Sequence, residues 1–327
     1  MAVYVNTNYS ALQGQRYLGN VQNSLTTTYQ RLSSGLRINS AKDDAAGLQI
    51  ADRLTSQING LNQGNRNAAD GIALAQTIEA GMDEISGMLQ KMRTLTVQAA
   101  NGTNTAQDRA ALSKEVASLA TEVNRIATQT TFAGKKVLNG KGTDSIFGAA
   151  GGAGGPGAGG NNGTAGKAGD KGTMTLQVGS NKGDVISFDV ESVMFSQLTG
   201  NITDLIGNGK VFSTNQNTGQ ISVTFTKATT GNGNDSFGAI IQLFDSAISK
   251  VDGMRAGLGA IQNRLESSIR NQSNVAANEA DARSRIRDAD FAEESANLSQ
   301  QSIIQQAAAS MLMQANTRPQ LGLSLLG

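Results

Sequence analysis

The sequence predicts a mainly α-helical protein: an elongated bundle of long, coiled-coil-like helices formed from both chain ends, with a small Gly-rich and β-hairpin-rich insert in the middle. Apolar residues recur at helical spacing through both ends of the 327-residue chain, whereas its middle is rich in glycine and in alternating, strand-like runs. Aromatic residues make up only 4% of the chain and tryptophan is absent. That scarcity favours thin helical packing, because a thick core normally buries several large aromatic side chains.

The first half of the chain predicts one very long helix. Its apolar or small residues recur every seven positions up to the turn signal "NGTN" at Asn101–Asn104, as is typical of a long amphipathic helix with a coiled-coil-like seam. Apolar spacing predicts a second helix through Leu112 and Ile126, and a third through Phe237 and Leu265. The heptad row of the long helix comprises Leu54, Leu61, Ala68, Ala75, Met82, Leu89 and Thr96.

The two ends of the chain carry thinner apolar stripes. A single thin helix buries too little surface to be stable in water, so we expect the two ends to pair and to become fully ordered on association. The predicted seam between them consists of Leu18, Val21, Leu25 and Leu32 near one terminus and Ile304, Ala308, Met311 and Ala315 near the other.

These patterns predict four parts of the chain. Residues 1–42 and 284–327 form the pair of terminal helices, with a spoke at about 31–44, and residues 43–140 and 235–283 form the long helical bundle. Residues 141–172 form a Gly-rich surface loop. Residues 173–234 form the β-hairpin-rich insert, with hairpins turning at Ser180–Gly183 and Asn217–Gly219. We assign the first hairpin to the bundle and the rest to a reduced variable outer region.

The stretch at 31–54 concentrates charges between two helices. Gly35 suits a left-handed residue after the end of the first helix. Ser40 and Asp43 have the spacing of a weak capping box, and Asp43 and Asp44 suit the positive end of the next helix. An assembly contact is the second role predicted for this stretch. The cations that remain for neighbouring chains are Arg31, Arg37 and Lys42.

A second mixed-charge stretch lies at 281–294, just before the C-terminal stripe. One interpretation is a solvated helix face, on which each ion pair contributes about 0–1 kcal/mol. We favour an assembly surface in which many weak pairs set the register. The residues predicted to act there are Arg283, Arg285, Arg287, Asp288 and Asp290.

Composition excludes several classes of function. Cysteine and histidine are absent, so the chain has no disulfide, no cysteine or histidine base or nucleophile, and no zinc site built from them. The 27 basic and 26 acidic residues nearly balance, which indicates no nucleic-acid partner. The chain contains no apolar run of about 18 residues, so the sequence predicts no segment that spans a membrane. We therefore predict a protein that is not an enzyme and has no cofactor and no metal.

Two stretches resemble the terminal signatures of bacterial flagellin. "RLSSGLRINSAKDDAAGL" at 31–48 is very similar to the N-terminal signature of the family. "ARSRIRDADFAEE" at 282–294 and "QQAAASMLMQAN" at 305–316 are similar to its C-terminal region. The family pattern does not extend to the middle of the chain. One departure is Arg287, which stands where the family pattern leads us to expect an acid.

The resemblance implies a structural subunit that self-assembles into the hollow filament of the flagellum for swimming motility. The terminal helices would form the inner tube, or D0 layer, and the long bundle the D1 layer. The implied partners are further copies of the chain, the flagellar cap, the hook–filament junction proteins, and an export chaperone on the C-terminal helix. The alternative is that the chain is itself a hook–filament junction protein of this family.

The resemblance also implies an extracellular location and recognition by a host. The N-terminal residues lack the cationic and apolar regions of a cleaved signal peptide, in keeping with signal-less export to the filament. Flagellins are sensed by a Toll-like receptor through the long-helix face, and "LQKMRTLTVQ" at 89–98 resembles the contacting segment. The residues at the receptor-contact positions are Lys91, Leu95 and Glu122.

Overall fold

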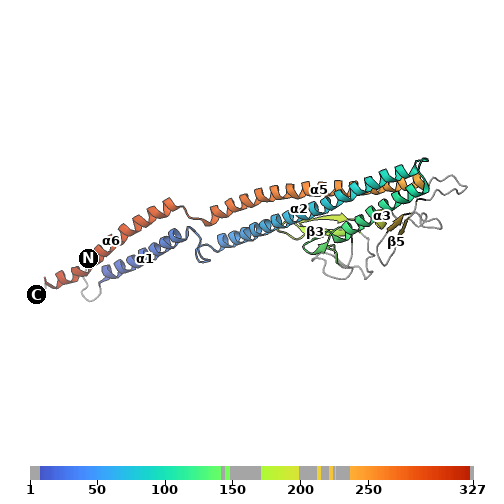
Figure 1. Ribbon diagram of the computed structural model, residues 1–327. Helices are drawn as coiled ribbons and strands as arrows, with labels where there is room; N and C mark the ends of the chain where they lie inside the picture. Colours follow the sequence, from blue (N-terminus) through green and yellow to red (C-terminus); the bar gives the residue numbers. More distant parts are fainter. Residues whose placement is uncertain are drawn as a thin grey trace. The chain divides into compact units, whose positions relative to one another are not determined.

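The computed structural model describes residues 8–140, 144–147, 171–198, 212–214, 221–223, 225 and 236–324 (Figure 1). The mainly α-helical prediction is confirmed. The described chain forms two compact units, Met1–Gly60 with Asn274–Gly327, and Leu61–Ser273. The helices are α1 (Tyr9–Ser34), α2 (Ala45–Ala100), α3 (Ala106–Gln129), the single turn α4 (Phe195–Leu198), α5 (Ser236–Arg287) and α6 (Phe291–Ser324).

Local sequence explains where the long helices begin and end. Helix α1 stops at Ser34 because Gly35 takes a left-handed conformation (φ 70°) and its N–H donates to the Arg31 carbonyl at 2.8 Å, which confirms the predicted role of this glycine. Helix α3 begins after a capping box in which Thr105 Oγ1 accepts from the Asp108 N–H and Asp108 accepts from the Thr105 N–H.

The predicted heptad row forms the core of the unit Leu61–Ser273. Its members from Leu61 to Thr96 are buried, and most of them are fully enclosed. The facing residues come from the two other predicted helices, so the packing of three long helices is confirmed. The principal partners on α3 and α5 are Val116, Ala120, Val123, Phe244, Val251, Leu258 and Leu265.

Both predicted hairpins are present. β3 (Gly172–Gln177) pairs antiparallel with β4 (Val185–Val190), and β5 (Phe212–Thr214) pairs with β6 (Ile221–Val223). The turn expected at Asn217–Gly219 and most of the Gly-rich loop lie outside the described residues. A third hairpin pairs β1 (Thr131–Phe132) with β2 (Lys135–Lys136). The sequence did not predict it, because a strand of two residues is too short to show alternation of apolar and polar residues.

The β3/β4 hairpin packs with one face on the helices of its own unit. Alternate residues of β4 are buried, beginning with Ile186 and including Phe188 and Val190. At its edge, Glu191 accepts ion pairs from Lys171 at 2.7 Å and from Lys250 of α5 at 3.2 Å. Both lysines hold the pKa of the Glu191 carboxyl below its usual value, the Lys171 hydrogen bond being the larger cause. The hairpin is thus tied to α5 by an ion pair.

Candidate assembly surfaces

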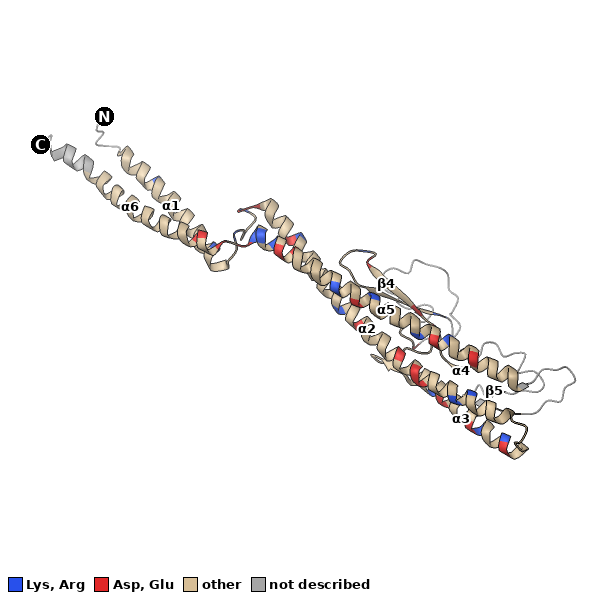
Figure 2. Ribbon diagram, turned by 90° about the horizontal axis from the view of Figure 1, so that it is seen from above, with Lys and Arg blue, Asp and Glu red and all other residues tan. Residues whose placement is uncertain are grey.

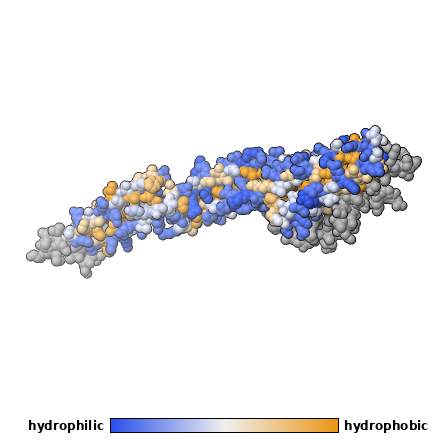
Figure 3. Space-filling model, in the orientation of Figure 1, coloured by the Kyte–Doolittle hydropathy of each residue, from blue (hydrophilic) through white to orange (hydrophobic). Residues whose placement is uncertain are grey.

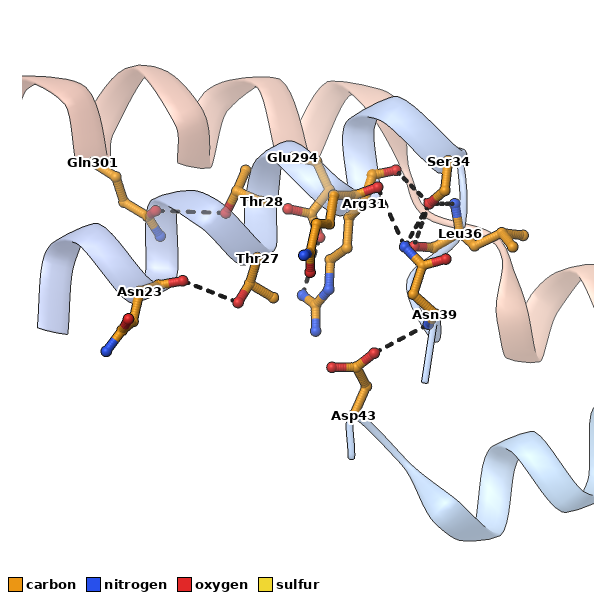
Figure 4. Close-up of polar contacts among 11 residues, drawn as sticks. Asn23, Thr27, Thr28, Arg31, Ser34, Leu36, Asn39, Asp43, Glu294 and Gln301 are labelled. Carbon is orange, nitrogen blue, oxygen red and sulfur yellow. Dashed lines mark hydrogen bonds and ion pairs between the residues drawn. The ribbon is translucent and has the colours of Figure 1, made fainter. Parts of the chain in front are cut away.

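Helices α1 and α6 pair in antiparallel fashion within the smaller unit (Figure 1). Polar side chains set their register at three levels along the pair, two of which Figure 4 shows at the end near the spoke. Asn8 Nδ2 donates to the Ala315 carbonyl at 2.8 Å, and Thr28 Oγ1 donates to Gln301 Oε1 at 3.5 Å. Arg31 Nη1 donates to Glu294 Oε1 at 3.2 Å.

The predicted seam residues mostly lie between the two helices. Leu18, Val21, Leu25 and Leu32 are half-buried, as are Ile304 and Ala315, and Ala308 is buried. Met311 is a correction, since it is 71% exposed and does not pack in the seam of the single chain. Its side chain faces solvent, and the neighbouring position on α6 makes the contact with α1. Leu312, one residue on, approaches Gly14 instead.

An open groove of about 680 Å³ runs between the two helices in front of Met311. Small residues such as Gly14 and Ala307 form much of its walls, so neither helix fills the space that the other leaves. The full lining is Ser10, Gln13, Gly14 and Tyr17 of α1, with Ile304, Ala307, Ala308, Met311, Gln314 and Ala315 of α6.

The surface of this helix pair is nearly free of charge and carries large exposed apolar side chains among uncharged polar ones. No Asp, Glu, Lys or Arg occurs between Glu294 and Arg318, and only Arg16 occurs between Asn8 and Arg31. Figure 2 shows the charges of the pair gathered at its spoke end, and Figure 3 shows apolar side chains open to solvent along it. Exposed apolar side chains gathered on one pair of helices favour an interaction site. The large residues more than half exposed are Tyr9, Leu12, Tyr17, Tyr29, Phe291, Ile303, Met311 and Met313.

The spoke consists of two chain segments that hydrogen-bond to each other, 35–38 and 286–289. The Arg287 carbonyl accepts from the Arg37 N–H at 2.7 Å and from the Ile38 N–H at 3.3 Å, and the Gly35 carbonyl accepts from the Ala289 N–H at 3.0 Å. Ile38 is fully buried beneath this ladder. The spoke is therefore a short two-stranded bridge between segments about 250 residues apart, and the signature residues on both sides hold it closed.

Two of the three cations predicted to face neighbouring chains are engaged within the chain. Arg31 pairs with the buried carboxylate of Glu294, and Arg37 Nη2 donates to the Ile286 carbonyl at 2.6 Å. These contacts escaped the sequence prediction because a cation's partner on a distant helix is not visible in local sequence. Contact of these cations with neighbouring chains stays a prediction. Lys42 is exposed, as expected.

The paired acids of the spoke have separate roles. Asp44 is the N-cap of α2, since its Oδ1 accepts from the backbone N–H groups of Ala46 at 3.1 Å and Gly47 at 2.9 Å. Asp43 instead closes the preceding turn, accepting from the Ser40 and Asn39 N–H groups and from the Ser40 hydroxyl. The expected capping box is thus corrected: its spacing is real, but it closes a turn four residues before the helix.

The Asp43 turn is expected to open as the pH falls. Its hydrogen bonds from the backbone of Ser40, then of Asn39, lower the pKa of the Asp43 carboxyl below its ordinary 3.8. A depressed native pKa contributes stability that is complete above the unfolded value and is lost as the pH falls through the folded value. Hydrogen-exchange protection of the Asn39 and Ser40 amides should therefore be full at neutral pH and fall below about pH 4. Asp43→Ala should already lack it at pH 7, whereas equal protection in both proteins would refute the role.

The charged stretch at 281–294 also makes contacts within the chain. Asp290 caps α6 by accepting from the Ala292 N–H at 2.8 Å, a role that the sequence reading did not assign. The other predicted residues act locally or across the smaller unit. Arg285 pairs with Asp281 at 2.9 Å, Asp288 accepts from Ser284 at 2.6 Å, Arg283 Nη1 donates to Thr55 Oγ1 at 3.4 Å, and Arg287 supplies the bridge carbonyl.

The predicted receptor-contact residues lie on α2 and α3. Lys91 is exposed and pairs with Glu115 at 2.8 Å, and Glu122 pairs with Arg125. Leu95 is a correction, because it is only 8% exposed and belongs to the core between these helices. This burial leaves little of its side chain for a partner to touch.

Two classes of site are absent from the described ranges of the chain. No group of three or more acidic side chains there is placed to hold a metal ion. No helix in those ranges is both long and apolar enough to cross a membrane.

Comparison with known proteins accounts for both ends of the chain. Residues 5–143 match the model of the bacterial flagellin N-terminal helical region, and residues 241–326 match that of the C-terminal helical region. The chain is 37% identical to flagellin B and 38% identical to flagellin D of Vibrio anguillarum, each aligned over 100% of both chains. The crystal structure of Bacillus cereus flagellin matches at 26% identity, with a TM-score of 0.41 over 65% of this chain and 94% of that one.

The family models cover well over half of the sequence, including the spoke bridge and the paired helices α1 and α6. Full-length relatives above 30% identity agree with them. The chain therefore belongs to the bacterial flagellin family, whose members are the structural subunits that polymerise into the extracellular flagellar filament.

Proposed function

We propose that this chain polymerises through the α1/α6 pair, whose open groove and exposed apolar residues are covered by further copies of the same chain. The observation that carries the proposal is the placement of large exposed apolar side chains on a helix pair almost without charge. Burying such a surface is favourable at about 25 cal/mol per Å², and few charges need to be desolvated.

The spoke bridge is proposed to hold the pair ready for assembly. Its backbone ladder and the Arg31–Glu294 ion pair join α1 to α6 at one end, and the Asn8 contact joins them at the other. A pair whose register is fixed before association loses less conformational entropy when it is buried. The exposed cation Lys42 remains as a candidate for contact with a neighbouring copy.

Other partners belong to the same proposal and rest on family membership. They are the flagellar cap, the hook–filament junction proteins, and an export chaperone that would cover the exposed apolar residues of α6 before assembly. Lys91 and Glu122 are accessible for contact with a host Toll-like receptor, whereas only a small part of the Leu95 side chain is exposed.

Seeded polymerisation tests the assembly role directly. Purified full-length chain is added to short filament fragments at low temperature, and electron microscopy measures filament length with time. A filament subunit should extend the seeds steadily into long polymers. If only a few subunits add to each seed and growth then stops, or if no subunit adds at all, the result would contradict the proposal and favour a hook–filament junction protein.

A further inference from the structure

The chain has an unusually restricted set of easily oxidised side chains. It contains no cysteine, no tryptophan and no histidine, but it has nine methionines. Thioethers react readily with peroxides and hypochlorous acid, and reactivity follows exposure. Oxidation of this protein is therefore directed to methionine by composition alone.

The fold divides these methionines sharply. Met82 and Met92 are completely enclosed between the long helices, and the methionines at 88, 174, 194 and 254 are partly buried against the same core. By contrast, Met311 and Met313 are 71% and 67% exposed. Both lie on the uncharged part of α6, and Met311 lines the α1/α6 groove. Within the described residues, the accessible thioethers are thus concentrated on the surface proposed for assembly.

We propose that Met311 and Met313 form a reversible oxidation site that controls whether a free subunit can polymerise, an inference that rests on the proposed assembly role of this surface. The oxidant is a hydroperoxide or hypochlorous acid. The thioether sulfur attacks an oxygen of the peroxide, the O–O bond breaks, and one oxygen is transferred to sulfur. With hydrogen peroxide the other product is water, so sulfur is oxidised and peroxide reduced by two electrons each.

The consequence for assembly follows from the change in polarity. A sulfoxide is a strong hydrogen-bond acceptor that is hydrated in the free subunit, whereas a thioether is only a weak acceptor. The groove beside Met311 is lined by Gly14, Ile304, Ala307 and Ala308, which offer no side-chain donor, and by Ser10, Gln13, Tyr17 and Gln314, which do. Covering this surface with a second copy would desolvate the new S=O group. The S=O group would exchange its water for groove residues placed to pack against an apolar side chain, and an imperfectly paired polar group is unfavourable enough to raise the concentration needed for assembly about tenfold. Folding of the subunit should be unaffected, because both side chains are solvent-exposed.

The test exposes the free full-length chain to dilute hydrogen peroxide and follows peptide masses and seeded growth together. Oxygen addition is expected first on the peptide that carries Met311 and Met313, well before Met82 and Met92. Growth should fall in parallel, while the circular dichroism stays unchanged. Treatment with both methionine sulfoxide reductases, one for each epimer, should restore growth.

Matched variants separate this site from general damage. Met311→Leu with Met313→Leu cannot be oxidised at these positions, so peroxide should not reduce its growth below the growth of the same variant without peroxide. Met254→Leu should lose the same fraction of its own untreated growth as the original chain does. Normal growth of the oxidised original chain, or equal inhibition of the double variant, would overturn the inference. Failure of untreated protein to extend seeds would instead overturn the proposed function, and the peptide masses would still decide whether these two methionines oxidise first.

Discussion

Replacing Gly64 with leucine is expected to lower the free energy of unfolding of the free subunit by about 2–3 kcal/mol or more, by forcing the β3/β4 hairpin away from α2. A side chain at this position would overlap the Val178 carbonyl oxygen and lie 2.7 Å from the carbonyl carbon. These are backbone atoms next to the turn that Asp184 holds, where the Val178 N–H donates to the Asp184 carbonyl at 2.9 Å. They cannot rotate aside, so the end of the hairpin has to move.

Gly87 provides the matched control on the same helix. A Cβ at Gly87 would meet no atom within 4 Å, so Gly87→Ala should stabilise α2 by about 0.5–1 kcal/mol through helix propensity alone. Gly64→Ala should destabilise, since even one methyl group enters the Val178 carbonyl. Chemical denaturation of the dilute subunit, followed by circular dichroism, measures all three variants. Equal shifts for Gly64→Ala and Gly87→Ala would refute the close contact.

The sequence predicted the long helices well because their burial is periodic. Each heptad residue of α2 from Leu61 to Thr96 faces the same side, and that regularity can be read without knowing the partner. Contacts between distant segments could not be read in this way. Nothing near Gly64 indicates that it meets the end of a strand more than a hundred residues later, and only the packed structure places Val178 against it.

The candidate assembly site shows the same division. Gly35 was predicted correctly because a helix end with left-handed glycine is a local pattern. The partners of Arg31 and Arg37 were missed because Glu294 and the Ile286 carbonyl come from the other end of the chain. Met311 was assigned to the seam by spacing, yet its side chain is exposed and Leu312 approaches Gly14 of α1 instead. A helical stripe therefore predicts which side of a helix faces its partner, but not how completely that partner covers it.

Substituting Ile303 with glutamate is expected to abolish seeded growth while the free subunit stays folded. Ile303 is 66% exposed on α6, so a glutamate at this position is hydrated in the monomer. The substitution should therefore shift the denaturation midpoint of the monomer no more than a typical surface substitution does. In the polymer the carboxylate would be desolvated on a surface whose own helices offer few cations, since α6 carries none between Glu294 and Arg318. An unpaired buried charge costs several kcal/mol, so the concentration required for growth should rise by about a hundredfold or more.

Two further variants of Ile303 isolate the cause of that loss. Ile303→Leu preserves the apolar surface and should extend seeds at nearly the original rate, because the buried volume changes little. Ile303→Gln is close to glutamate in shape but uncharged, so its effect should be intermediate if desolvation of charge dominates. Filament length by electron microscopy and the residual soluble concentration at steady state measure all three. If Ile303→Glu extends seeds as well as Ile303→Leu does, the exposed apolar residue at 303 lies outside the contact between copies, and the assembly surface has to be confined to the groove side of the α1/α6 pair.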